Sequence, residues 1–193
     1  ILGCVLSAGQ GMNIARQAAL SAGIPEKVPA YTINKVCGSG LKAILLGAQS
    51  IALGESDIVV AGGVENMSQA PYLLREMRWG SKLGHRQMID SILNDGLRDA
   101  FCDCQMGQIA ENIAQEFSIS RRDQDEFAFQ SQKKCAEAKQ AGKFSSEIVS
   151  MLVPQKTGEE KEFSQDEFLR PDTTMEGLSK LKPAFIKDGT ITA

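Results

Sequence analysis

Apolar and polar positions in the first sixty residues alternate between a strand-like and a helix-like pattern. Residues 1–7 form an apolar run that leads into a glycine turn at residues 8–11. Residues 12–22 then place alanine and isoleucine side chains at helical spacing. Gly23, with Pro25 two residues later, is a helix stop. The pattern predicts a strand followed by a helix.

The same pattern repeats over the next forty residues. A strand is expected from Tyr31 to about Val36, and a helix over residues 39–53, whose apolar side chains cover most of its surface. A helix this apolar is expected to be buried between layers. Residues 57–61 are apolar enough for the middle of a parallel sheet. This βαβαβ order predicts right-handed crossovers and an α/β layer structure.

The chain becomes more polar after residue 63. Residues 64 to about 187 hold most of the charge and are mostly helical in pattern. A capping box at residues 120–123 opens a helix that is expected to reach about residue 141. A short strand is expected over 147–153, followed by a turn. We interpret this stretch as a large insertion on the α/β core, and residues 190–192 as the start of a return to that core.

Composition excludes several classes of protein. The 193 residues are 42% hydrophobic, enough for one core or for one core and a smaller satellite. The balance of 21 basic and 24 acidic side chains gives a net charge of −3, which argues against a nucleic-acid partner. No run approaches the roughly 20 apolar residues that span a bilayer, so no membrane partner is expected.

The cysteines bear on two questions, the redox compartment of the protein and the presence of a metal site. Five cysteines without framework spacing indicate a reducing compartment. Cys102 and Cys104 form a C-x-C pair, but no second pair or histidine cluster completes a zinc site, so we expect no metal. Cys4 is expected in the core, and Cys135 lies in a charged helical stretch.

Cys37 is the candidate nucleophile. It ends a predicted strand and precedes Gly38-Ser39-Gly40, which opens the apolar helix. A strand-to-helix turn exposes its side chain, and glycines let a substrate approach the backbone. The helix N-terminus favours a thiolate, and its free N–H groups can stabilise an oxyanion. A small buried cysteine beside a glycine-rich turn is the alternative, and the pattern alone leaves both open.

The only histidine, His85, lies in a cationic stretch. It is either a solvated loop residue or a general base for Cys37. The surrounding cations either form a solvated surface or face a polyanionic ligand. The turn at residues 8–11 lacks the third glycine and the ribose-binding acid of a dinucleotide fingerprint, so that function is rejected.

Several stretches resemble the thiolase family in the same order along the chain. Residues 34–43, Asn-Lys-Val-Cys-Gly-Ser-Gly-Leu-Lys-Ala, resemble its nucleophile motif, and residues 61–68 the strand and turn that follow. Further matches cover the rest of the chain: Met106-Gly107 with Ala110-Glu111-Asn112, Ser120-Arg121 with Gln124-Asp125, and Lys182-Pro183-Ala184-Phe185. In detail the chain is most similar to the biosynthetic, acetoacetyl-CoA branch.

The resemblance implies an α/β thiolase-like fold with an incomplete N-terminal βαβαβ core over 1–68. A mostly helical loop domain would cover 69–187, and residues 188–193 would begin the return to the core. The implied reaction is the reversible condensation of two acetyl-CoA to acetoacetyl-CoA and CoA, with an acyl group on Cys37 and no cofactor besides these substrates. The Cys37 backbone N–H would form part of an oxyanion hole. The implied substrate-binding residues are Leu97, Met106, Arg170, Ala184 and Phe185.

The resemblance also implies a homo-oligomer, a dimer or a tetramer, assembled with help from residues 75–88. It favours a cytoplasmic location, with mitochondria or peroxisomes as alternatives. Gln105 and Gln108-Ile109 depart from the family pattern beside the implied acyl pocket. The family's Gly-His-Pro histidine, second cysteine and Asn-Glu-Ala-Phe asparagine would lie beyond residue 193, and its first strand and helix before Ile1. A ketoacyl-synthase-like enzyme and a truncated, non-catalytic CoA- or partner-binding form are the alternatives.

Overall fold

The computed structural model describes residues 1–192 and contains two compact units. The first spans Ile1–Cys104 and the second begins at Gln105. The domain boundary expected from the family resemblance, after residue 68, falls inside the first unit and stays a prediction.

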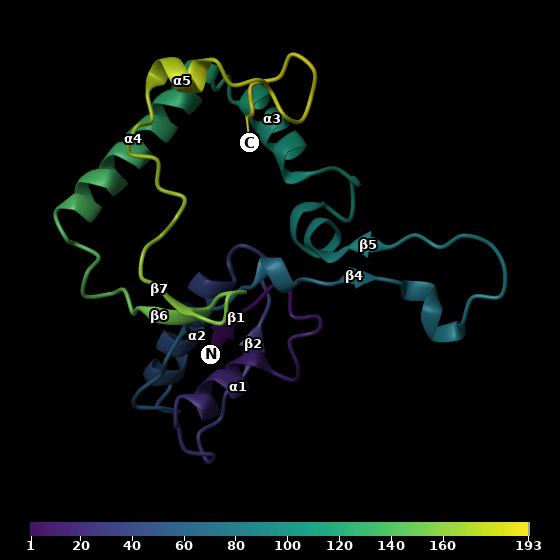
Figure 1. The fold of residues 1–193 in the computed structure, drawn as a ribbon, viewed down its shortest axis with the longest axis vertical. Helices are drawn as coiled ribbons and strands as arrows, with labels where there is room; N and C mark the ends of the chain where they lie inside the picture. The colour runs from purple at the N-terminus through teal and green to yellow at the C-terminus, as the bar shows by residue number, and fades with distance from the viewer. Residues whose placement is uncertain (193) are drawn as a thin grey trace. The chain divides into compact units, whose positions relative to one another are not determined.

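The first unit is built on a three-stranded parallel sheet (Figure 1). Its strands are β1 (Leu2–Gly3), β2 (Thr32–Ile33) and β3 (Gly62–Gly63), in the order β2-β1-β3. The helices α1 (Ile14–Ser21) and α2 (Ser39–Ala52) connect them. The predicted βαβαβ core is therefore confirmed, and β1 is its central strand.

The strands are shorter than the apolar runs that predicted them, and the third one is displaced. Residues 57–61 were expected in the sheet, but the paired residues are Gly62 and Gly63. Ile58 and Val60 remain 86% and 67% exposed. The prediction fails because the ladder falls on glycines, which carry no apolar or β-branched signal.

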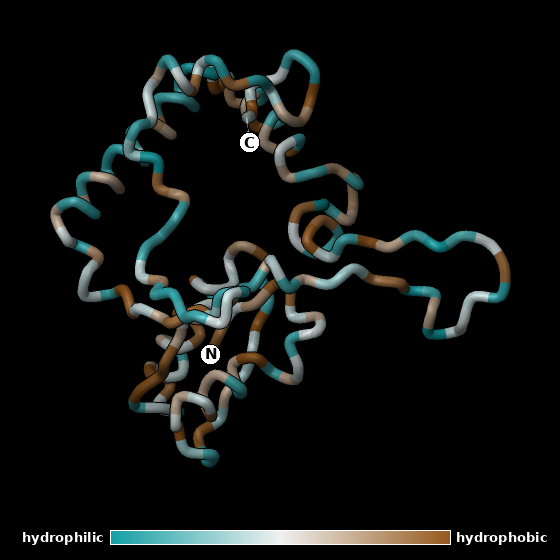
Figure 2. Tube along the Cα trace, viewed as in Figure 1, coloured by the Kyte–Doolittle hydropathy of each residue, from teal (hydrophilic) through white to brown (hydrophobic). Residues whose placement is uncertain are grey.

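Helix α2 begins at Ser39 as predicted, but its expected burial between two layers is wrong for this chain. Only Ser39, Ala43 and Gly47 are buried, because a sheet of three short strands covers one face of the helix. The other face is apolar and open to solvent. Figure 2 colours each residue along the chain by its hydropathy. Its large exposed residues are Leu41, Ile44, Leu45 and Ile51, between 46% and 65% exposed.

Glycines allow the N-terminus of α2 to lie directly against the sheet. A Cβ atom on Gly3 would stand 2.6 Å from both the carbonyl carbon and the Cβ of Ser39. A Cβ atom on Gly63 would stand 3.8 Å from the Cα of Gly40. Because a side chain at Gly3 has no room, this glycine fixes how closely the first turn of α2 approaches β1.

The remainder of the first unit is a hairpin arm. Strands β4 (Tyr72–Leu73) and β5 (Ile89–Asp90) pair antiparallel at the base of a long loop, as Figure 1 shows. The short helices η1 (Met67–Gln69) and η2 (Arg75–Trp79) lie before and within this arm. A π-helical segment, η3 (Ile92–Leu97), follows it.

The second unit is mainly helical. It contains α3 (Met106–Glu116), α4 (Arg121–Gln140) and α5 (Met175–Ser179), with an antiparallel hairpin of β6 (Met151–Pro154) and β7 (Glu160–Phe163). The predicted start of α4 is confirmed: the Asp123 backbone N–H donates to the Ser120 hydroxyl at 3.2 Å, and the Ser120 N–H donates to the Asp123 carboxylate at 3.3 Å. Within residues 1–192, none of the helices has the length and apolar character needed to cross a bilayer.

Candidate active site

Cys37 lies on the turn between β2 and α2, at the carboxyl end of the parallel sheet. It is a free thiol and is exposed, so the alternative of a buried core cysteine is removed. Cys4, by contrast, is buried as expected. Ligands of parallel α/β sheets bind outside the carboxyl ends of the strands, which is where Cys37 is presented.

Ser39 holds this turn through both functions of its hydroxyl group. Its oxygen accepts a hydrogen bond from the Lys35 N–H at 2.8 Å, and its O–H donates to the Val36 carbonyl at 2.6 Å. Ser39 itself is 4% exposed. Val36 adopts a left-handed backbone with φ of 49°, an outlier for a β-branched residue. The residue immediately before Cys37 is therefore held in a costly conformation.

Glu65 fixes the loop that follows β1. Its carboxylate accepts hydrogen bonds from the backbone N–H groups of Val5 at 2.8 Å and Leu6 at 3.0 Å. The Cys4 thiol also donates to it, at 3.6 Å. Burial raises the pKa of the Cys4 thiol, and the charge of Glu65 raises it further. Cys4 is thus a structural thiol, in contrast to Cys37.

In the second unit, three of the expected substrate-binding residues come together at the start of α3. Met106 is its first residue, and a Cβ on the following Gly107 would stand 2.3 Å from the ring of Phe185. The Ala184 backbone N–H donates to Ile191 at 3.0 Å, which closes residues 184–191 into a loop. The structure therefore places Met106, Ala184 and Phe185 at one location.

A buried carboxylate holds that loop. Glu111, on α3, is 6% exposed and accepts hydrogen bonds from the backbone N–H of Thr190 at 2.9 Å and of Ile191 at 2.8 Å. Desolvation raises the pKa of Glu111, but these hydrogen bonds together outweigh it, so the pKa lies below its ordinary value. A carboxylate that stays ionised is the stronger acceptor for two backbone donors.

Helix α4 supports the same segment from its N-terminal end. The Arg121 guanidinium pairs with the Asp125 carboxylate at 2.8 Å and donates to the carbonyls of Leu178 and, at 3.0 Å, Leu181. The Gln124 amide donates to the Thr190 hydroxyl at 3.0 Å. In the sequence, Arg121, Gln124 and Glu111 stood out only as matches to the family. Their role in holding residues 178–191 was not predicted. The burial of Glu111 emerges only in the folded structure, and the sequence offered no separate signal for it.

The two departures from the family pattern interact with each other. The Gln105 backbone N–H donates to the Gln108 side-chain oxygen at 2.9 Å, immediately before the first turn of α3. This bond satisfies one donor at the start of the helix. The substitutions therefore act as a local pair beside Met106.

The other two expected binding residues are Arg170, in the second unit, and Leu97, in the first. The Arg170 backbone N–H donates to the Gln132 side chain at 2.9 Å, which anchors it on α4 and leaves the residue exposed. Leu97 ends η3 in the first unit and is 40% exposed. Within residues 1–192, no hydrogen bond joins the His85 imidazole to Cys37, so the structure does not support His85 as its base.

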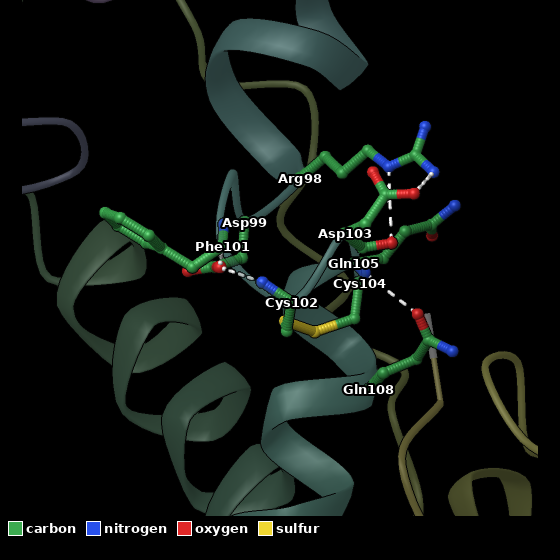
Figure 3. Close-up of a disulfide and its surroundings, with 8 residues drawn as sticks. All are labelled: Arg98, Asp99, Phe101, Cys102, Asp103, Cys104, Gln105 and Gln108. Atoms are coloured by element: carbon green, nitrogen blue, oxygen red, sulfur yellow. Dashed lines mark hydrogen bonds and ion pairs between the residues drawn. A yellow bond between two sulfur atoms is a disulfide. The ribbon is translucent and has the colours of Figure 1, made fainter.

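Cys102 and Cys104 form a disulfide, a pairing that the sequence analysis did not anticipate (Figure 3). Their Cα atoms are 5.3 Å apart, and Asp103 between them has a left-handed φ of 57°. The Asp99 carboxylate accepts from the N–H groups of Cys102 and Phe101 at 2.9 and 2.8 Å, and these bonds hold its pKa below its usual range. The sequence analysis missed this local pair because the number of cysteines is odd and their spacing is irregular.

The parallel βαβαβ sheet with an exposed cysteine on the strand-to-helix turn defines an α/β protein with a candidate cysteine nucleophile. The whole chain, residues 1–193, matches the family model described as "Thiolase, N-terminal domain". The chain therefore belongs to the thiolase family, and the family expected from the sequence is confirmed.

The relatives found support the same family. A probable acetyl-CoA acyltransferase of Staphylococcus epidermidis is 55% identical over 193 residues, which is 100% of this chain and 49% of that protein. A Staphylococcus aureus protein of the same name has the same identity and coverage. The crystal structure of the Bacillus anthracis acetyl-CoA acetyltransferase matches with a TM-score of 0.92 and 42% identity, over 99% of this chain and 48% of that one. The chain spans about half the length of the curated relatives it matches.

Proposed function

We propose that the protein catalyses the thiolase reaction, the reversible condensation of two acetyl-CoA to acetoacetyl-CoA and CoA. The observation that carries this proposal is the exposed thiol of Cys37 on a fixed turn at the N-terminus of α2. The names of the relatives support an acetyl-CoA substrate. Their thiolase-type names do not favour the ketoacyl-synthase-like alternative.

Cys37 carries the acyl group in this proposal. Its thiolate attacks the acetyl-CoA carbonyl carbon, the carbonyl electrons move to the oxygen, and collapse of the oxyanion expels the CoA thiolate, which takes up a proton. The N–H of Cys37 is a proposed donor to that oxyanion. A second acetyl-CoA then loses a proton from its methyl carbon and attacks the acetyl-cysteine, which releases acetoacetyl-CoA and restores the thiolate.

The substrate contacts fall on the second unit in this proposal. An apolar cluster suits the pantetheine and acyl end of CoA. It consists of Met106, Ala184 and Phe185. Arg170 offers an exposed guanidinium for the anionic adenosine end. Leu97, on the first unit, is proposed as a separate contact residue, and no cofactor besides the CoA thioesters is proposed.

We also propose that the protein is a cytoplasmic enzyme of lipid metabolism and a homo-oligomer, with the tetramer favoured. Support comes from the hairpin arm, where Trp79 and Leu83 are 92% and 91% exposed. Large apolar side chains on an extended arm are typical of a surface that another subunit covers.

Acyl transfer to Cys37 is tested by mass spectrometry. Protein expressed from its full-length gene is incubated with acetyl-CoA and digested in acid. We expect an added acetyl mass on the Cys37 peptide, lost in Cys37→Ala and kept in Cys135→Ala, a control at another exposed thiol. A label on Cys4 or Cys135 instead would overturn the assignment.

A further inference from the structure

The left-handed Val36 is hydrogen-bonded to the side chain two residues before it. The Asn34 side-chain oxygen accepts a hydrogen bond from the Val36 N–H at 2.8 Å. This bond folds the backbone back on itself immediately before Cys37, as asparagine side chains do in turns. The Ser39 hydroxyl holds the same peptide from the helix side through the Val36 carbonyl. Val36 is therefore bonded at both its N–H and its carbonyl.

The other end of the Asn34 amide reaches the loop after β1. Its nitrogen donates to the Val5 carbonyl at 3.5 Å. The N–H of the same Val5 donates to the Glu65 carboxylate at 2.8 Å. Asn34 thus lies between two fixed backbone groups, and Glu65 anchors one of them. Glu65 is separated from Cys37 by 28 positions in sequence, but in this network only three residues, Val5, Asn34 and Val36, lie between them.

We propose that Asn34 is a positioning residue for the Cys37 nucleophile, and that Glu65 acts through Val5 to orient the Asn34 amide. This inference rests on the proposed role of Cys37 as acyl carrier. The amide oxygen keeps Val36 left-handed, and this conformation sets how Cys37 is presented to the backbone N–H groups at the N-terminus of α2. These groups stabilise a thiolate and a developing oxyanion only when the sulfur is aligned with them.

Alkylation of native protein tests the proposal without relying on thiolase turnover. Protein from the full-length gene is treated with iodoacetamide, and the rates at the Cys37 and Cys135 peptides are measured by mass spectrometry across pH. Cys135 is exposed in the other unit and serves as an internal reference. We expect Asn34→Ala and Glu65→Gln to lower the Cys37-to-Cys135 rate ratio about tenfold at neutral pH, with kcat reduced and KM for acetyl-CoA little changed.

Two further variants make the test specific. Asn34→Asp keeps an acceptor for the Val36 N–H and should restore the ratio to within about threefold of wild type. Glu55→Gln removes a carboxylate at the C-terminal end of α2, which accepts from Ser50, and should leave the ratio unchanged. If Asn34→Ala makes the buried Cys4 reactive, the fold has opened, and Asn34→Gln, which keeps both amide groups one methylene farther out, replaces it.

The outcomes separate this proposal from the proposed function. Wild-type rates at Cys37 in Asn34→Ala and Glu65→Gln, with only the melting temperature reduced, would show a structural role alone and overturn the inference. A reduced ratio in a protein that transfers no acetyl group to Cys37 would contradict the proposed function instead, and would leave the positioning of the thiol in place.

Discussion

At the scale of single residues, the left-handed Val36 has a consequence for stability. Its φ of 49° brings a β-branched side chain against its own backbone, at a cost of about 1–2 kcal/mol. Val36→Gly removes this cost. It also destabilises the folded protein by about 0.5–1 kcal/mol, because glycine loses more conformational freedom on folding than valine does. We expect the free energy of unfolding, measured in urea, to rise by about 0.5–1 kcal/mol while acetyl transfer to Cys37 slows. A less stable variant would contradict the strain argued at Val36.

Arg170 is predicted to act on binding and not on chemistry. Its guanidinium is exposed while its backbone is anchored on α4, so Arg170→Ala removes a charge without loosening the chain. KM for acetyl-CoA should rise about tenfold, or about 1.4 kcal/mol, with kcat little changed. Arg122→Ala, at an exposed arginine on the same unit, is the matched control. A fall in kcat at constant KM would place Arg170 at the reacting atoms.

Sequence reasoning singled out the candidate nucleophile but not the residues that hold its turn. Cys37 stood out because the turn residues around it are glycine and serine, whose conformational roles are local and visible in sequence. Glu65 and Glu111 act on backbone groups 59 and 79 residues away, respectively. Such partners emerge only when the chain is folded, so a single sequence shows the carboxylate but not its donors.

At the scale of elements, the loop after α5 depends on an ionised Glu111. The pKa of Glu111 is lowered in the folded protein, so its stabilising effect is present above the ordinary value of 4.5 and is lost as pH falls through the lower folded-state value. The only tryptophan, Trp79, lies in the other unit, so hydrogen exchange of α3 is the suitable measurement. Protection should fall below pH 4.5 in wild type and depend less on pH in Glu111→Gln.

The disulfide predicts a thiol count. The 193-residue chain expressed alone should show three titratable thiols after denaturation without reductant, at Cys4, Cys37 and Cys135, and five after reduction. Cys102→Ser should leave four thiols with or without reductant, because Cys104 is then free. Five thiols in unreduced wild-type protein would show that the pair is a dithiol, as expected of a reducing compartment.

The helices were predicted more accurately than the strands, for a physical reason. The expected helices at 12–22, 39–53 and 120–141 correspond to α1, α2 and α4 with ends that differ by two residues or fewer, because caps and 3.6-residue spacing are local signals. The strands depend on which residues lie opposite. In β3 these are two glycines, so the apolar residues before them drew the prediction to residues 57–61.

At the scale of the whole molecule, two features indicate that these 193 residues need further chain for activity: the exposed apolar face of α2 and the single histidine. Helix α2 has a continuous apolar face next to the turn that carries Cys37. Its exposed residues are Leu41, Ile44, Leu45 and Ile51. A face of this kind needs another layer to cover it. We expect the 193-residue chain by itself to associate in solution, measured by light scattering, and to show no acetoacetyl-CoA thiolysis above a Cys37→Ala control.

Measurable turnover by a monodisperse preparation of these 193 residues, lost on Cys37→Ala, would contradict that expectation. It would mean that His85 or another group within the chain activates Cys37. Lys35→Ala and His85→Ala variants would then identify the group.

The strand order β2-β1-β3 has a consequence for synthesis of the protein. Of these three strands the central one is synthesised first, and its two neighbours lie 30 and 60 positions later in the register Leu2↔Thr32 and Leu2↔Gly62. At a translation rate of about 5–20 residues per second, β1 waits about 3–12 s for its second neighbour. Because the strands are parallel, no hairpin can nucleate this sheet, and helices α1 and α2 connect its strands. The sheet beside the Cys37 turn is complete only after Gly62 and Gly63 have left the ribosome.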